Sequence, residues 1–219
     1  MTSRACILYF LRAPRPGRVK TRLAASLGDE AALTLYKAFV EDMLQALDGC
    51  GADTVLWVEP AGDVDMARAW LGDGRTYRPQ PEGDLGFRMD HAFRWAFAQG
   101  YASAAALGSD LPGLTPKLAR SLARLMHSEP ALIGPSPDGG YWTIGFQAAA
   151  YAPEVFTGMP WSGPELYAKT WRVVEPLQPA VLPEMRDMDT VEDLRALAAS
   201  PPADAARRTM DAIRAMGIG

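Results

Sequence analysis

Residues 5–22 read ACILYFLRAPRPGRVKTR, and the interpretation of the chain begins with this stretch. Its first part, Ala5–Leu11, is an uninterrupted apolar run, which predicts a strand buried on both faces of a sheet. Its second part is a loop with two prolines and one glycine that carries five cations, Arg12, Arg15, Arg18, Lys20 and Arg22. Because the whole chain has a net charge of −4, this cluster indicates either an anionic ligand or a solvated surface loop.

Apolar runs and helical periodicities alternate along the rest of the chain. The apolar runs predict strands at Thr54–Val58, Ala102–Leu107, Ala131–Gly134 and Tyr141–Phe146, with a brief extended piece near Arg75–Arg78. Apolar residues at helical spacing predict the helices Lys20–Leu27, Glu30–Leu47, Val64–Leu71, Gly86–Gln99, Thr115–His127, Thr190–Ala199 and Ala203–Met216. This alternation predicts an α/β fold, a three-layer α/β/α sandwich with a mostly parallel, Rossmann-like sheet. The segment from Ala150 to Pro183 is irregular.

Length and composition are those of an ordinary globular protein. The 219 residues, 48% of them apolar and 22% charged, are expected to form one domain over residues 1–219. Two cysteines and two histidines exclude a disulfide framework and a histidine-rich metal site. We find neither a signal peptide nor an apolar stretch of membrane-spanning length, which predicts a cytoplasmic protein without membrane insertion. The acidic net charge argues against a nucleic-acid partner.

Aspartates follow the predicted strands at the points where parallel sheets bind their ligands. Asp110 in GSDLP comes after the run Ala102–Leu107, and Asp138 in SPDGG follows the next predicted strand. A further segment, RDMDT, holds Asp187 and Asp189 just before a predicted helix. Since ligands bind beyond the carboxyl ends of such strands, we expect the cationic loop to face these carboxylates. Arginine and lysine suit phosphates and aspartate suits Mg²⁺ or Mn²⁺, so the pattern predicts a polyphosphate and a divalent metal.

Each of these aspartate segments also has a structural interpretation. Asp110 before Leu-Pro and Asp138 in PDGG are common turn residues, and Asp84 in EGDLG is a candidate helix cap. In RDMDT, Thr190 with an aspartate three residues later fits a capping box. A capping role for Thr190 leaves Asp187, which lies farther from the helix, as the freer carboxylate.

Six motifs occur in order between residues 10 and 195: FLRAPRPGRVKTRLAASLG, GDLGFRM, GSDLPGLT, GPSPDGGYWTIGF, PWSGPEL and RDMDTVEDL. In this combination the chain resembles a bacterial family of glycosyltransferase-like proteins, described as selenodomain-associated transferase 1 or as arsenosugar biosynthesis glycosyltransferase. The resemblance covers nearly the whole chain and implies the GT-A fold of the nucleotide-diphospho-sugar transferases. The KTRL and DMDTVEDL segments are also similar to those of phospholactate guanylyltransferases.

The resemblance implies roles for individual residues. The first loop would bind the nucleotide phosphates through Arg12, Lys20 and Arg22. The loop before the fourth helix would contact the base or the ribose through Gly83, Asp84 and Gly86. The implied metal ligands are Asp110 and Asp187, with Asp189 as second choice, and the implied catalytic set is Lys20, Asp110, Asp138 and Asp187. The acceptor would lie near Asp138, Tyr141, Trp142 and Trp161.

The resemblance therefore predicts a metal-dependent transferase with a nucleotide-activated donor. The favoured interpretation is that the protein is a glycosyltransferase, which uses a nucleotide-diphospho-sugar and a small-molecule acceptor. A nucleotidyltransferase that uses a nucleoside triphosphate and releases pyrophosphate, and a non-catalytic nucleotide-binding protein, remain alternatives. Nucleotidyltransferases usually open with a glycine-rich loop, and this loop has only Gly17, which favours glycosyl transfer. A monomer and a homodimer both remain open.

Overall fold

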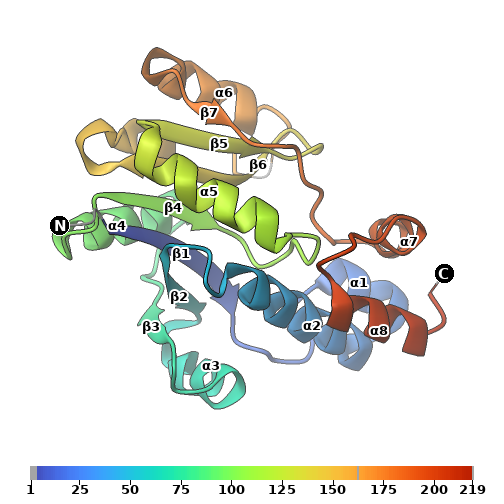
Figure 1. The fold of residues 1–219 in the computed structure, drawn as a ribbon. Coiled ribbons are helices and arrows are strands. Elements are labelled where there is room, and N and C mark those ends of the chain that lie inside the picture. The colour runs from blue at the N-terminus through green and yellow to red at the C-terminus, as the bar shows by residue number, and fades with distance from the viewer. Residues whose placement is uncertain (1–3, 162, 219) are drawn as a thin grey trace.

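The computed structural model describes residues 4–161 and 163–218, with a mixed β-sheet at its centre. The strands are β1 (Ala5–Arg12), β2 (Asp53–Glu59), β3 (Thr76–Pro79), β4 (Ser103–Leu107), β5 (Ala131–Pro135), β6 (Tyr141–Gln147) and β7 (Ala180–Val181). Within the described residues they form a seven-stranded sheet in the order β3-β2-β1-β4-β6-β5-β7 (Figure 1). β6 runs antiparallel to its neighbours β4 and β5, and the other strand pairs are parallel. The mostly parallel sheet that the sequence predicts is confirmed.

Helices cover both faces of this sheet. The α-helices are α1 (Thr21–Leu27), α2 (Asp29–Leu47), α3 (Val64–Leu71), α4 (Leu85–Ala98), α5 (Pro116–Ser128), α6 (Leu166–Val174), α7 (Val191–Ala199) and α8 (Arg207–Ala215). Short 3₁₀ helices span Ala61–Asp63, Ala148–Ala150, Pro153–Phe156 and Glu175–Leu177.

Residues of β1 alternate between two hydrophobic clusters, one on each face of the sheet. Ile7 and Tyr9 belong to the cluster that α2, α3 and α5 cover, whereas Cys6 and Leu8 belong to the cluster that α4 covers. All four side chains are fully buried. β1 is therefore a central strand, and the predicted three-layer α/β/α arrangement is confirmed.

A third cluster of buried side chains joins the C-terminal helices to the first two. It combines Leu23 of α1, Phe39 of α2, Leu194 of α7 and Ile213 of α8 with Met188, which precedes α7. Figure 1 shows α7 and α8 packed beside α1 and α2, far along the chain but close in space. This packing brings the RDMDT segment next to the cationic loop.

The predicted helix Ala203–Met216 is shorter in the structure and begins only at Arg207. The reason is the buried carboxylate of Asp42 on α2, which accepts hydrogen bonds from the backbone N–H groups of Arg208 (3.0 Å) and Thr209 (2.8 Å). Both N–H groups belong to the first turn of the helix, where backbone N–H groups have no acceptor within the helix. A cap supplied from a distant helix fixes this boundary.

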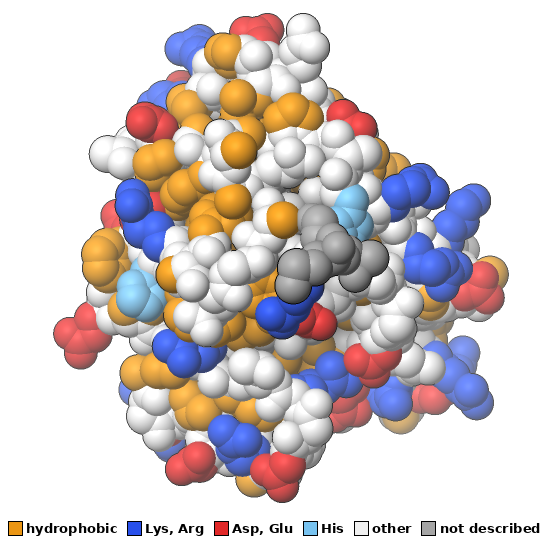
Figure 2. All heavy atoms as spheres, turned by 60° about the vertical axis from the view of Figure 1, so that its left-hand side comes forward, with side chains coloured by type: hydrophobic (Ala, Val, Ile, Leu, Met, Phe, Trp, Pro, Cys, Tyr) orange, Lys and Arg blue, Asp and Glu red, His pale blue; other side chains and the backbone are white. Residues whose placement is uncertain are grey.

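The surface carries charges of both signs. Figure 2 shows positive and negative side chains interspersed with apolar ones over one face of the molecule. Among the described residues, no helix has the length and apolar character needed to cross a membrane.

Candidate active site

The strand order creates a crevice at the carboxyl end of β1. β1 pairs with β2 on one side and with β4 on the other, so the loops that leave β1 and β4 diverge, as at the ligand sites of open α/β sheets. Because β6 is antiparallel, its first residues lie at this same edge, on the right-hand side of Figure 1. The structure thereby gathers the predicted segments at one edge of the sheet.

Lys20 lies at the start of α1 and points its amine into this crevice. Its side chain is only 5% exposed, and its Nζ lies 3.0 Å from Asp110 Oδ2 and 2.8 Å from Asp189 Oδ1. Burial opposes the charge on the amine, but the two carboxylates overcome this effect and raise the pKa of Lys20. The amine therefore remains an ammonium group that bridges the two aspartates.

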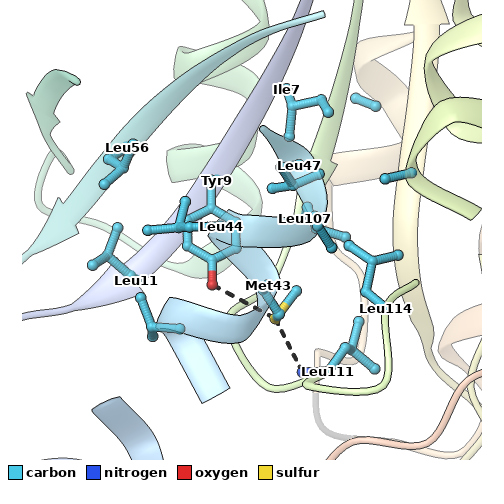
Figure 3. Close-up of a cluster of buried hydrophobic side chains, with 14 of the residues drawn as sticks. Ile7, Tyr9, Leu11, Met43, Leu44, Leu47, Leu56, Leu107, Leu111 and Leu114 are labelled. Carbon is cyan, nitrogen blue, oxygen red and sulfur yellow. Dashed lines mark hydrogen bonds between the residues drawn. The ribbon is translucent and has the colours of Figure 1, made fainter. Parts of the chain in front are cut away.

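Asp110 is held in place by a loop that is anchored in the hydrophobic core. The backbone N–H of Leu111, which is 2% exposed, donates to the sulfur of Met43 (3.2 Å), and the hydroxyl of Tyr9 donates to the same sulfur (3.5 Å; Figure 3). The Met188 N–H donates to the carbonyl of Asp110 (3.0 Å). These contacts bury Leu111 and leave the Asp110 carboxylate facing the crevice.

The sequence Asp187-Met188-Asp189 places two carboxylates on one side of an extended segment. Met188 is buried in the cluster formed by α1, α2, α7 and α8, and side chains alternate sides along extended backbone. Asp187 and Asp189 both line the crevice. The following Thr190 forms the predicted capping box of α7 with Asp193, which is confirmed.

Asp187 stands out electrostatically. Partial burial, together with the carboxylates of Asp110, Asp189 and Asp138, raises its pKa to about 7, although the charge of Lys20 acts in the opposite direction. Its carboxylate accepts no hydrogen bond from the part of the chain that the structure describes. The crevice thus contains more negative charge than Lys20 neutralises.

Two adjoining cavities open at this edge of the sheet. The first, of about 600 Å³, is lined on the cationic side by Arg12, Lys20, Arg22, Gly83 and Arg88. The second, of about 470 Å³, is lined on its far side by Asp138, Tyr141, Trp142, Trp161 and Asp187. Both cavities share Phe10, Arg22, Leu85, Gly108, Asp110 and Asp189. The Lys20 ion pairs therefore lie at the border between a cationic cavity and an aromatic, acidic one.

In the first cavity, Glu59 connects two arginines. Its carboxylate lies 3.1 Å from Arg12 Nε and 2.6 Å from Arg88 Nη1. Arg88 also donates to the Gly83 carbonyl (3.0 Å) and to Gln80 Oε1 (3.4 Å). Sequence reasoning missed Glu59, Gln80 and Arg88, although Arg88 lies within the GDLGFRM motif.

The three residues predicted to contact base or ribose differ in position. Gly83 lines the first cavity with φ 138°, a conformation that favours glycine. Asp84 instead caps α4, since its carboxylate accepts from the Phe87 N–H (2.8 Å). Gly86 is buried, and a Cβ there would come within 2.2 Å of the Phe156 carbonyl oxygen. Neither Asp84 nor Gly86 is among the described residues that line the two cavities, and the contact of both with base or ribose stays a prediction.

Some residues of the predicted acceptor side also form hydrogen bonds that stabilise the fold. The Asp138 carboxylate accepts from the Gly140 N–H (2.9 Å), which closes the turn between β5 and β6, and it also lines the second cavity. Trp142 is 4% exposed and donates from Nε1 to the Pro183 carbonyl (3.0 Å), which fastens the segment that leads to Asp187. Tyr141 and Trp161 complete this side of the cavity.

The outer cations of the loop are more exposed. Arg22 is 75% exposed, and its Nη1 lies 3.4 Å from Asp189 Oδ2. Arg15 forms two hydrogen bonds to Asp63, of 2.5 and 2.6 Å, and lines neither of the two cavities. Only part of the cationic loop therefore faces the crevice.

The donor chemistry of the crevice fits a divalent cation. Asp110, Asp187 and Asp189 offer the hard carboxylate oxygens that Mg²⁺ and Mn²⁺ prefer. In residues 4–161 and 163–218, however, no group of three His, Cys, Asp or Glu side chains is arranged to hold a metal ion. The Lys20 ammonium lies between the carboxylates of Asp110 and Asp189.

Comparison with known proteins agrees with the α/β fold. Residues 42–163 match the family described as "Uncharacterized protein conserved in bacteria (DUF2064)", and the chain belongs to this family. None of the curated proteins is significantly similar to it. The chain is similar to a "putative nucleotide-diphospho-sugar transferase" from Desulfovibrio desulfuricans G20, with 35% identity, a TM-score of 0.89, and 98% of this chain and 97% of that chain covered.

Two more distant proteins share the fold. One is CMP:2-keto-3-deoxy-manno-octonic acid synthetase complexed with CTP, with a TM-score of 0.54, 12% identity, and 90% of this chain and 99% of that chain covered. The other is Rv0371c from Mycobacterium tuberculosis H37Rv in complex with manganese, with a TM-score of 0.50, 18% identity, and 91% and 100% covered. The chain thus has the fold of nucleotide-sugar and nucleotidyl transferases.

Proposed function

We propose that the protein is a metal-dependent glycosyltransferase that transfers a sugar from a nucleotide-diphospho-sugar to a small acceptor. The observation that carries this proposal is the border between the two cavities, where Lys20 lies between Asp110 and Asp189. A donor whose nucleotide occupies the cationic cavity and whose sugar enters the acidic one would have its diphosphate at this border.

The cations of the first cavity have the chemistry to stabilise the leaving group. Glycosyl transfer moves negative charge onto the departing nucleoside diphosphate, and preorganised cations lower the free energy of that transition state. The Lys20 side chain is buried, which limits the positions of its amine, and Arg12 is the last residue of β1. A divalent metal held by Asp110 and Asp187, with Asp189 as a further ligand, would neutralise additional phosphate charge.

The second cavity suits an acceptor with a hydroxyl group or another proton to lose. Asp138 lines it with one carboxylate oxygen engaged by the Gly140 N–H, so its other oxygen can accept a proton from the acceptor. Tyr141 and Trp161 also line it, and aromatic side chains suit the apolar parts of a sugar.

The named relatives support the proposal in two ways. The Desulfovibrio desulfuricans protein, at 35% identity, carries the nucleotide-diphospho-sugar transferase description in its name. The complex of Rv0371c with manganese is an example of the same fold with a divalent metal.

Nucleotidyl transfer is the second candidate function. The synthetase complexed with CTP shares the fold, and an attack on the α-phosphorus of a nucleoside triphosphate would draw on the same cations. The two reactions differ in their products, because one releases a nucleoside diphosphate and the other releases pyrophosphate.

The test is a product screen. The purified protein is incubated with Mn²⁺ or Mg²⁺, a panel of nucleotide sugars and nucleoside triphosphates, and a panel of small hydroxylated acceptors, and released diphosphates are identified by ³¹P NMR. Release of a nucleoside diphosphate from one nucleotide sugar is expected. Release of pyrophosphate from a triphosphate would establish nucleotidyl transfer instead. The absence of turnover with every donor and acceptor would contradict both proposed transferase functions.

A further inference from the structure

The Lys20 ammonium occupies the position in which a divalent cation would meet Asp110 and Asp189. Its Nζ is within 3.0 Å of an oxygen of each carboxylate, and its side chain is almost completely buried. A cation that approaches these two aspartates therefore encounters a positive charge already seated between them. Repulsion between such charges is strong in a partly buried crevice, where solvent screens little.

Asp187 differs from these two aspartates. It has no ion pair within the described residues, and it faces the same crevice. Arg22, the other cation at Asp189, is mostly exposed and its contact is longer, at 3.4 Å. Lys20 is thus the charge that decides whether Asp110 and Asp189 are open to a metal.

Lys20 also has a second possible partner on its other side. It lines the cationic cavity together with Arg12 and Arg22, so phosphate oxygens in that cavity would lie within its reach. Lysine carries a compact charge on a flexible stem and can exchange one anionic partner for another without a fixed geometry.

We propose that Lys20 and a divalent cation compete for Asp110 and Asp189, and that phosphate groups bound in the cationic cavity attract Lys20 and thereby admit the cation. The inference rests on the proposed function in its assignment of the cationic cavity to phosphates. It makes the binding of metal and of nucleotide mutually favourable, and by linkage each tightens the other by the same factor.

The experiment measures Mn²⁺ affinity without any nucleotide and without turnover. Free Mn²⁺ is followed by electron paramagnetic resonance in titrations of the wild type, Lys20→Met and Lys20→Gln, and circular dichroism checks that each variant is folded. Arg18→Met is the matched control, since it removes one positive charge from the same loop at an exposed residue. Loss of Lys20 is expected to tighten Mn²⁺ binding at least about tenfold, whereas Arg18→Met changes it less than about twofold.

A second arm needs no variant and tests the admission of the cation by phosphate even if the Lys20 variants do not fold. The wild type is titrated with Mn²⁺ in sodium sulfate and in sodium chloride of equal ionic strength, with sulfate as a phosphate-like anion. Sulfate is expected to tighten Mn²⁺ binding at least about fivefold. Unchanged affinity in folded Lys20→Met and Lys20→Gln would overturn the competition, and unchanged affinity in sulfate would overturn the admission by phosphate.

These outcomes are independent of the proposed reaction. If no donor is turned over but the Mn²⁺ affinities change as described, the proposed function fails and the competition stands. If a donor is turned over and the Mn²⁺ affinities do not change, only the competition is lost.

Discussion

Lys20 and Arg15 belong to the same loop, and each pairs with aspartate, but their surroundings differ. Lys20 is 5% exposed and bridges Asp110 and Asp189 at the border of two cavities. Arg15 is 48% exposed and pairs with Asp63 on the flank of the loop. Burial and position thus separate cations that sequence alone treats as one cluster, because an exposed ion pair contributes little, whereas breaking the pairs of a buried charge leaves that charge uncompensated.

The sharpest test of this comparison removes the carboxylate partner of Lys20. Asp110→Asn keeps the size and turn-forming capacity of the side chain but loses the charge available to a metal. We expect a loss of metal-dependent turnover of at least about 100-fold, the scale of a removed electrostatic contribution to the transition state. Steady-state kinetics with Mn²⁺ measures it.

Asp73→Asn is the control for Asp110→Asn, because Asp73 is 91% exposed and lines neither of the two cavities. Its turnover should equal that of the wild type. Equal activity of folded Asp110→Asn and Asp73→Asn would mean that Asp110 only stabilises the turn of its loop and does not contribute to the reaction.

The next largest effect is expected from the buried cation itself. Lys20→Ala should weaken nucleotide binding by roughly 1.5–3 kcal/mol, the range of a hydrogen bond to a charged group. The measurement is calorimetric titration of a nucleoside diphosphate in EDTA, so that a change in metal affinity does not enter. Binding as tight as in the wild type would remove Lys20 from the phosphate site.

Asp187 tests the charge of the crevice through pH. Its pKa is raised from 3.8 to about 7 in the folded protein, so the carboxyl contributes stability below pH 3.8 that is lost as the pH rises to about 7. In EDTA, Asp187→Asn should therefore gain stability over the wild type as the pH rises from 4 to 7, by roughly 2 kcal/mol, and keep that gain above pH 7. Urea unfolding at pH 4, 5.5, 7 and 8 measures the difference, and parallel curves for the two proteins would contradict it.

Much of the fold could be predicted because its elements carry local signals. The buried strands up to β6 are apolar runs, and the helices that pack on them have apolar residues at helical spacing. α6 and β7 were missed, since they lie in the irregular segment from Ala150 to Pro183 and β7 has only two residues. The antiparallel direction of β6 depends on pairing with β4 and β5, which no local pattern specifies.

The candidate site also has features that the sequence predicts and features that depend on tertiary packing. The rule for parallel sheets was enough to bring Asp110, Asp138 and the cationic loop to one edge. The pairing of Lys20 with Asp189, 169 positions later in the chain, results from the packing of Met188 between α1, α2, α7 and α8. The roles of the predicted site residues in binding and catalysis remain predictions, to be decided by the variants above.

The smallest expected effect belongs to Arg15, the other member of the comparison. Arg15 has an exposed position and a partner, Asp63, that lies outside the two cavities of the crevice. Its contribution to a bound nucleotide is limited to long-range attraction, which salt screens. Arg15→Ala should therefore weaken nucleotide binding less than about fivefold, in the same titration that is used for Lys20→Ala. The residual effect should shrink when the ionic strength is raised, whereas the effect of Lys20→Ala should persist because the Lys20 side chain is buried. If both variants lost affinity equally and both losses vanished in salt, the loop would be a solvated cationic surface, and the distinction between its buried and exposed cations would have no functional meaning.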